Sequence, residues 1–293
     1  MATPHEQEAD ELHERARELD DPEQALAMYH RVLELDPKRP TTLYNIGLIY
    51  KYRGDWQLSR EFNQRAVHLS PEDEAANWNL AIAATALRDW ATARAVWRRL
   101  GILEAEGEGP IEVNFGKTPV RLNPDDAGEV VWGDRIDPVR VRVLNVPYPE
   151  SGFRYGDIVL HDGAPVGSRE SEGREYSVFN VLELFEASSF STYHAEVRIE
   201  RDCDAEELTQ ALDDAGVIHE DWTRSVRILC KQCSEGRAHE QHDHDLQRDW
   251  QDRHLIGLAV SDPAEAQRII AQWSNQQRWL VRLELRLSPP MRH

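Results

Sequence analysis

The sequence predicts a multidomain α+β protein with three parts in order: an α-helical solenoid, a small β-rich domain and a βαββαβ domain. Three observations lead to this fold class. A 34-residue repeat fills the first third of the chain, a glycine-rich stretch at residues 107–110 ends the helical pattern, and strand and helix patterns alternate after about residue 190. We place the three parts at residues 6–105, 111–190 and 191–293.

The repeat becomes visible when the chain is aligned against itself with a shift of 34 residues. Pro37 then falls on Pro71, and small residues alternate with large ones at matching positions. Two antiparallel helices approach closely only where one of the facing side chains is small. In the second unit, residues 41–52 and 56–69 are amphipathic segments on either side of a turn at 53–55, so each unit is predicted to be a helix, a short turn and a second helix.

Several positions of the second unit carry a family pattern, namely Leu43, Ile46, Gly47, Tyr50, Ala66 and Pro71. The region 6–105 therefore resembles the tetratricopeptide repeat (TPR) family, and the resemblance implies an α-helical TPR solenoid of three repeats. The first repeat departs from the pattern, with His13 where glycine is usual, and the third has Ala105 in place of the closing proline. The remainder of the chain resembles no family.

The resemblance implies that a peptide or partner protein binds in a groove lined by the first helix of each repeat. The lining positions include Asp10, Glu14, Tyr44, Asn45, Leu48, Tyr52, Asn79 and Thr85. Asn45 and Asn79 are 34 residues apart, and their amides can hydrogen-bond a ligand backbone. Members that bind a chaperone's terminal carboxylate use lysine and arginine, whereas this first repeat has Asp10 and Glu14. A neutral or basic protein segment is therefore the expected partner, and docking of the repeats on the rest of the chain is the alternative.

Composition excludes several classes of partner. The net charge is −19, from 34 basic and 53 acidic residues, so the chain should repel nucleic acid and anionic membranes. Its first ten residues lack the apolar region of a signal peptide, and no stretch of 18 apolar residues exists to span a membrane. Three cysteines do not form a disulfide framework. We therefore expect a cytoplasmic protein.

The middle segment is predicted to be β-rich. Residues 139–144 alternate apolar and charged side chains, and residues 157–160 form a second short apolar run that leads into a turn at 161–163. Short strands at this spacing indicate a small barrel or an open sheet. His161 is interpreted as a turn residue, and the segment contains no catalytic constellation.

The last third is predicted to have strands at residues 193–200, 225–229, 255–260 and 279–285. One helix follows Asp204 as its N-cap, and a second begins at Pro263. This βαββαβ order is the ferredoxin-like arrangement. The connection between its second and third strands runs from about residue 230 to 253. This is long for a hairpin loop, so the connection needs stabilising contacts of its own to be ordered.

That connection holds a cluster of metal-ligand residues at 230–244, which are Cys230, Cys233, His239, His242 and His244. Two thiols two residues apart and nearby imidazoles are the ligands of tetrahedral zinc, so Cys230, Cys233 and two of the three histidines are predicted to hold a structural zinc ion. A redox dithiol, which needs a strand-to-helix context, and an ordinary solvated loop are the alternatives.

These features favour a non-enzymatic scaffold or adaptor protein that binds a partner through its repeats and has a zinc-stabilised carboxyl-terminal domain. The surplus histidine leaves open a metal-responsive or metal-handling protein. A zinc-dependent hydrolase, with Glu235 or Glu240 as its base, is a further alternative. We assign no catalytic residue from the sequence.

Overall fold

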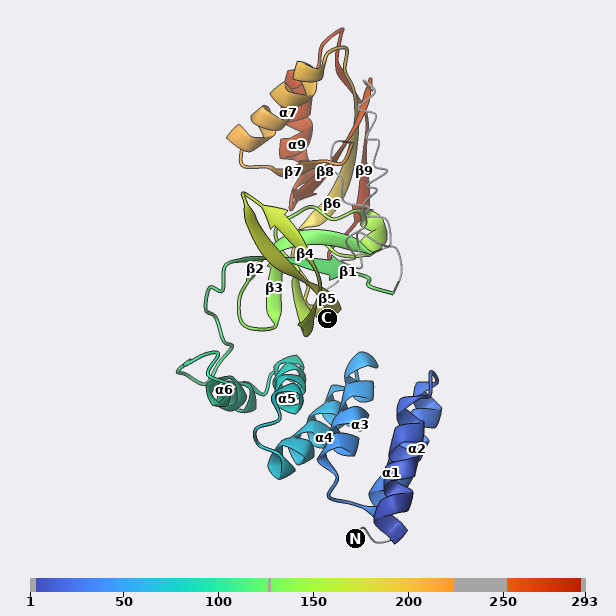
Figure 1. The fold of residues 1–293 in the computed structure, drawn as a ribbon. Helices are drawn as coiled ribbons and strands as arrows, with labels where there is room; N and C mark the ends of the chain where they lie inside the picture. The colour runs from blue at the N-terminus through green and yellow to red at the C-terminus, as the bar shows by residue number, and fades with distance from the viewer. Residues whose placement is uncertain (1–3, 126–127, 224–251, 291–293) are drawn as a thin grey trace. The chain divides into compact units, whose positions relative to one another are not determined.

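The computed structural model describes residues 4–125, 128–223 and 252–290. Contacts divide the chain into two compact units, Met1–Glu112 and Val113–His293. Helices make up the regular structure of the first unit, and the second contains the strands (Figure 1). Within the described ranges, no helix is long and apolar enough to cross a membrane.

The first unit contains three consecutive helical hairpins. Their helices are α1 (Pro4–Arg17) with α2 (Pro22–Leu35), α3 (Pro40–Tyr52) with α4 (Trp56–Leu69), and α5 (Glu74–Ala86) with α6 (Trp90–Arg99). The predicted boundaries of the second hairpin are confirmed to within one residue. Helix α3 begins at Pro40 because proline suits the first turn of a helix, where the missing N–H has no partner to lose.

The second helix of every hairpin begins after an aspartate, and these N-caps, Asp21, Asp55 and Asp89, are each 34 residues apart. The three carboxylates accept hydrogen bonds from the backbone N–H groups of Glu23 (2.9 Å), Leu58 (3.3 Å) and Thr92 (3.1 Å). A capping aspartate stabilises a helix by about 1 kcal/mol. The 34-residue repeat therefore fixes the start of each second helix as well as its apolar face.

Close packing inside the second hairpin depends on Gly47 of α3. A Cβ atom at this position would lie 2.4 Å from the amide nitrogen of Asn63 on α4. The hydroxyl of Ser59 donates to the Gly47 carbonyl at 2.9 Å, so the two helices also meet through a direct hydrogen bond. Glycine is required here because α3 and α4 approach each other so closely.

In the second unit, five strands form a closed barrel. They are β1 (Lys117–Leu122), β2 (Glu129–Arg135), β3 (Arg140–Val143), β4 (Ile158–Ser171) and β5 (Arg174–Glu186). Consecutive strands pair antiparallel, and a parallel pairing of β1 with β5 closes the barrel. Its interior is filled mainly by valines: Val120, Leu122, Val131, Val141, Val143, Val159 and Val181.

Both strands predicted in this segment are confirmed as parts of β3 and β4, but the predicted turn at residues 161–163 is wrong. These residues lie inside β4, and His161 is fully buried. The β4–β5 pairing shifts register between Leu160 and His161 and again between His161 and Pro165. The Asp-Gly pair that suggested a turn therefore marks an irregularity in a long, bent strand, since bulges accommodate such residues without ending the strand.

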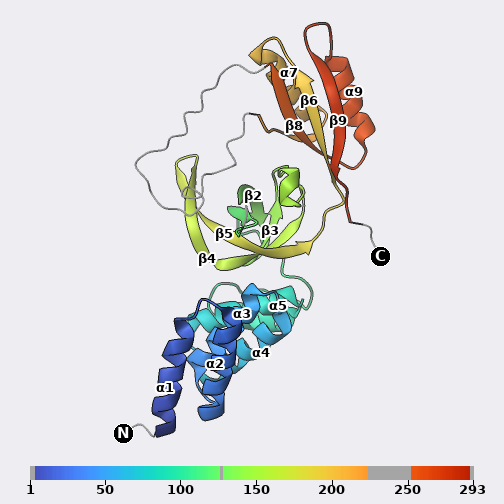
Figure 2. The same ribbon diagram turned by 90° about the vertical axis from the view of Figure 1, so that its right-hand side faces the viewer.

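The remaining elements of the unit form a four-stranded sheet with two helices. They are β6 (Ser191–Arg198), α7 (Asp202–Asp214), β7 (Ile218–Asp221), β8 (Arg253–Val260), α9 (Pro263–Trp273) and β9 (Trp279–Leu287). The strands lie in the order β7-β8-β6-β9, and all neighbours are antiparallel. Helices α7 and α9 cover one face of this sheet (Figure 1 and Figure 2). The core between them contains Ala195, Val197, Leu208, Leu212, Ile256, Leu258 and Ile270.

One local prediction for this sheet is untested, and another needs correction. The strand that follows α7 is β7 at residues 218–221, whereas the predicted strand at 225–229 lies outside the described residues. Asp204 is not the N-cap of α7: the cap is Arg201, and Asp204 is the third helical residue, where its carboxylate accepts a hydrogen bond from the Arg201 N–H at 3.0 Å. The Asp204 N–H donates in turn to the Arg201 backbone carbonyl at 3.0 Å. The arrangement is therefore half of a capping box, because the arginine side chain has no acceptor for the return hydrogen bond.

The barrel and the sheet share a buried junction. The indole N–H of Trp222, just after β7, donates to the carbonyl of Val146 at 3.0 Å, and the Tyr148 hydroxyl donates to the carbonyl of Trp222 at 3.1 Å. The indole also lies against Gly257 of β8, where a Cβ would approach it to 2.2 Å. Ala259, Tyr155 and Phe190 complete the apolar cluster.

This junction overturns the predicted fold class, a TPR solenoid followed by a separate β-rich domain and a separate ferredoxin-like domain. Six helices are followed by one sheet-rich α+β unit, in which the barrel and the sheet pack together. The sequence pattern could not reveal this packing, because the spacing of apolar residues predicts individual helices and strands and not the contacts between distant ones. Val146 and Trp222, for example, are 76 positions apart.

Candidate partner-binding surface

Helix α3 carries three large side chains at a spacing of four residues, which places them along one face of the helix. They are Tyr44, Leu48 and Tyr52, and we call them the α3 stripe. Tyr52 is 62% exposed, while Tyr44 and Leu48 are half-buried. The ammonium group of Lys51 lies 4.3 Å from the centre of the Tyr52 ring. Sequence reasoning missed Lys51, although an adjacent lysine and tyrosine are a signal of such a cation–π contact.

The two predicted ligand-binding amides have different surroundings. The side-chain N–H of Asn45 donates to the hydroxyl of Tyr29 on α2 at 3.1 Å, so the amide joins consecutive hairpins. Asn79, at the equivalent position of the third hairpin, is only 5% exposed, and its amide nitrogen has no hydrogen-bond partner in the described residues. Tyr52 is therefore the most exposed of Tyr44, Asn45, Leu48, Tyr52 and Asn79.

The predicted groove positions of the first and third hairpins also make contacts within the helical unit. Asp10 of α1 pairs with Arg39 at 2.6 Å, and Glu14 pairs with Arg17 at 3.0 Å. Both acids stay exposed. The Thr85 hydroxyl donates to a carbonyl of its own helix and is buried, so it offers no surface for a partner.

The predicted metal ligands Cys230, Cys233, His239, His242 and His244 lie outside the described residues, as do Glu235 and Glu240. The structure does describe where the surrounding segment begins and ends. At one end, the Trp222 N–H donates to the Leu255 carbonyl at 2.8 Å, and Leu255 donates to the Thr223 hydroxyl at 2.7 Å. At the other end, Asp252 pairs with Arg198 of β6. Both ends are therefore attached to the sheet.

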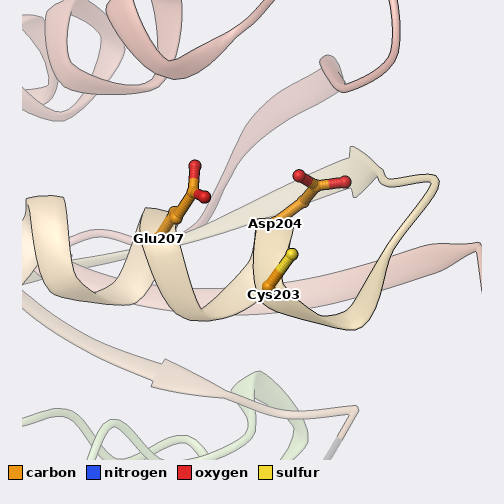
Figure 3. Close-up of side chains that lie close together, drawn as sticks. All are labelled: Cys203, Asp204 and Glu207. Carbon is orange, nitrogen blue, oxygen red and sulfur yellow. The ribbon is translucent and has the colours of Figure 1, made fainter.

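One group of possible ligand atoms occurs among the residues that the structure describes: Cys203, Asp204 and Glu207, whose ligand atoms lie within 4.8 Å of one another at the start of α7 (Figure 3). Both acids already have cationic partners. Asp204 pairs with Arg201 at 2.7 Å and Arg278 at 3.3 Å, and Glu207 pairs with Arg278. The hydrogen bond from Arg201 lowers the pKa of Asp204. Helix capping and ion pairing account for this cluster, and it gives no support to the zinc prediction.

His161 is the most strongly perturbed titratable group in the barrel. Burial, and then the charge of Arg135, lower its pKa from 6.5 to about 3. Its Nδ1–H donates to the Asp162 carbonyl at 2.7 Å, and its ring lies 4.9 Å from that of Phe179. The imidazole is fully buried in a strand and is neutral, so it serves packing and offers no base to a substrate.

Comparisons with known proteins add little to this description. No family model matches the chain, and no curated protein matches it. Among solved structures, the chain is similar to a hypothetical protein from Neisseria gonorrhoeae with 12% sequence identity, over 60% of this chain and 96% of that chain, at a TM-score of 0.28. A likeness at this level supports no conclusion about fold or function.

Proposed function

We propose that this chain is a non-enzymatic scaffold or adaptor protein whose helical unit, similar to tetratricopeptide repeats, binds a peptide or protein segment. The observation that carries the proposal is the α3 stripe, because Tyr52 exposes more of its side chain than any other large apolar or aromatic residue described. Exposed aromatic side chains supply large contact area at little cost in side-chain entropy. Tyr44 and Leu48 extend that contact along α3.

The net charge of the chain favours a neutral or basic partner segment. Asp10 and Glu14 of α1 are exposed acids, and the whole chain carries a net charge of −19. Such a surface attracts cationic segments and repels acidic ones. The same charge opposes binding to nucleic acid or to an anionic membrane, and we infer a cytoplasmic location from the sequence.

Selection from a random peptide library on the purified full-length protein tests this proposal. We expect neutral or basic sequences with apolar residues to be enriched, and the affinity of the basic ones to fall as salt is added. Enrichment of acidic sequences would contradict the charge argument. Failure to enrich any sequence, in a sample whose helical content is intact, would contradict the peptide-binding function itself.

We also propose that the 230–244 segment binds one structural zinc ion through Cys230, Cys233 and two of His239, His242 and His244. The support is the ligand set in the sequence, together with the contacts that Trp222 and Asp252, the described residues before and after this part of the chain, make with the sheet. Elemental mass spectrometry should find one zinc per chain in untagged protein and none in the Cys230→Ser/Cys233→Ser variant. Equal zinc in both proteins would contradict this assignment.

The metal content and an assay of hydrolytic activity separate the two alternatives. Several weakly held ions per chain would favour a metal-responsive or metal-handling protein. The observation that suggests this alternative is the third histidine, which a four-coordinate zinc site does not need. A hydrolytic activity that disappears in a Glu240→Gln variant with its zinc retained would favour a zinc-dependent hydrolase.

A further inference from the structure

Strand β9 is an edge of the four-stranded sheet. It pairs with β6 on one side, and no strand in the described part of the chain pairs with its other side. It spans nine residues, whereas β7 at the opposite edge spans four. An edge strand presents backbone N–H and C=O groups that can pair with another strand, and a long edge presents more of them. The β9 edge is therefore the better template for strand addition.

Large apolar side chains are exposed along this edge. Trp279 is 43% exposed, Val281 45% and Leu285 52%, and these three are among only eight such side chains in the described residues. Apolar surface gathered on one element marks an interaction site more often than single exposed side chains do. The position of these residues on an edge strand indicates a partner that is itself a strand.

Register shifts in the β6–β9 pairing limit where a partner strand fits. The run Arg282–Leu285 pairs regularly with residues 193–196 of β6, and the pairing shifts at both ends of this run. Bulges of this kind bend an edge strand and interrupt its pairing. The regular run therefore centres a partner strand close to Leu283, with Val281 just beyond one end of the run.

The sequence at this centre is complementary to itself. In an antiparallel pair with a two-fold axis at Leu283, Arg282 of one copy lies opposite Glu284 of the other, and Val281 lies opposite Leu285. Opposite charges and apolar pairs across two strands are favourable, whereas like charges directly opposite are unfavourable. A parallel pair in register would place Arg282 opposite Arg282. We propose that two copies of this chain associate through antiparallel pairing of β9 about Leu283.

The ion pairs that already exist in each copy fit this arrangement. Glu284 contacts Arg282 at 2.8 Å and Arg286 at 3.8 Å, and Arg282 also contacts Glu196 of β6 at 3.0 Å. Pairing of two copies joins the two networks across the axis. Exposed ion pairs contribute little to affinity, so the charges set the register, and the backbone hydrogen bonds and apolar pairs hold the copies together.

Sedimentation velocity on the full-length protein over a wide range of concentration tests the proposal. We expect a reversible dimer in the wild type and a dissociation constant raised by about tenfold or more in Leu285→Lys, which sets a lysine against Val281 of the other copy. Glu284→Arg should also weaken the dimer because it places Arg282 opposite an arginine. Leu184→Lys on β5 is the matched control, since Leu184 is 40% exposed and lies on the barrel.

Far-UV circular dichroism and thermal unfolding show whether each variant is folded, and Val281→Lys replaces Leu285→Lys if the latter unfolds. A wild type that stays monomeric at every concentration would overturn the proposal. A strand of another protein would then be the remaining candidate partner for β9. A dimer that is unchanged in folded Leu285→Lys, Val281→Lys and Glu284→Arg would place the contact elsewhere and would overturn it as well.

Discussion

Gly54 and Arg88 occupy the same position in consecutive hairpins, 34 residues apart, and both have a positive φ, 71° for Gly54 and 59° for Arg88. Each follows the first helix of its hairpin. The Gly54 N–H donates to Lys51 and the next N–H to Tyr50, and Arg88 and its successor make the equivalent bonds to Thr85 and Ala84. This pattern ends a helix through a left-handed residue, which glycine adopts without strain and arginine does not.

Substitutions at these two positions should therefore have opposite effects. We expect Gly54→Ala to lower the free energy of unfolding of the helical unit by about 1 kcal/mol and Arg88→Gly to leave it unchanged or raise it. Urea unfolding followed by circular dichroism measures both. Gly109→Ala is the control, because Gly109 has no positive φ and no atom within 4 Å of the added Cβ. A stabilised Gly54→Ala would contradict the assignment of left-handed strain.

The contact between Gly47 and Asn63 yields a second prediction. In Gly47→Ala the new methyl group meets the Asn63 amide, and overpacking of this kind costs about 1–3 kcal/mol. Combining it with Asn63→Ala removes the obstructing amide, so the double variant should be more stable than the sum of the two single effects predicts. A double-mutant cycle in urea measures this coupling, and purely additive effects would show that the helices do not meet at this point.

The pH dependence of stability provides a third prediction. The pKa of His161 falls from 6.5 to about 3 on folding, mainly because of burial. Between these pH values the unfolded chain binds a proton that the folded chain does not. The free energy of unfolding is therefore unaffected by His161 above pH 6.5 and decreases as the pH falls from 6.5 towards 3. The slope from one such group is at most about 1.4 kcal/mol per pH unit. Burial raises the pKa of Asp157, which contributes with the opposite sign above pH 3.8.

Urea unfolding at several pH values between 6.5 and 3 measures this slope. His161→Leu should reduce the slope, and His68→Gln, at an exposed position on α4, is the matched control. An equal slope in the wild type and in a folded His161→Leu protein would show that the imidazole is not held neutral by the barrel.

The sequence predicted the helical hairpins well because each boundary has a local chemical signal. Pro40, Gly54 and Asp55 mark a helix start, a helix end and an N-cap within fifteen residues of one another, and the structure places the boundaries of α3 and α4 there. Strand β3 was found in the same way, since alternating apolar and charged residues indicate a strand that is buried on one face.

Features that depend on distant contacts were not found. Strand β7 is short and mostly polar, and the apolar run at 225–229 was the stronger local signal. Trp222 gave no sign of joining the barrel to the sheet, because its partners at Val146 and Gly257 are remote in sequence. For the partner-binding surface, the pattern located the α3 stripe but could not show that Asn79 is buried.

The central claim is that the α3 stripe binds the partner. The most direct measurement is the affinity of a library-selected peptide, by fluorescence anisotropy, for the wild type and for Leu48→Ala, Tyr52→Ala and Leu69→Ala. Leu69 on α4 is an exposed apolar residue outside the stripe. We predict that each stripe variant weakens binding by about tenfold, which corresponds to about 1.4 kcal/mol, while Leu69→Ala binds as the wild type does. Unchanged affinity in both stripe variants, or an equal loss in Leu69→Ala, would contradict the claim.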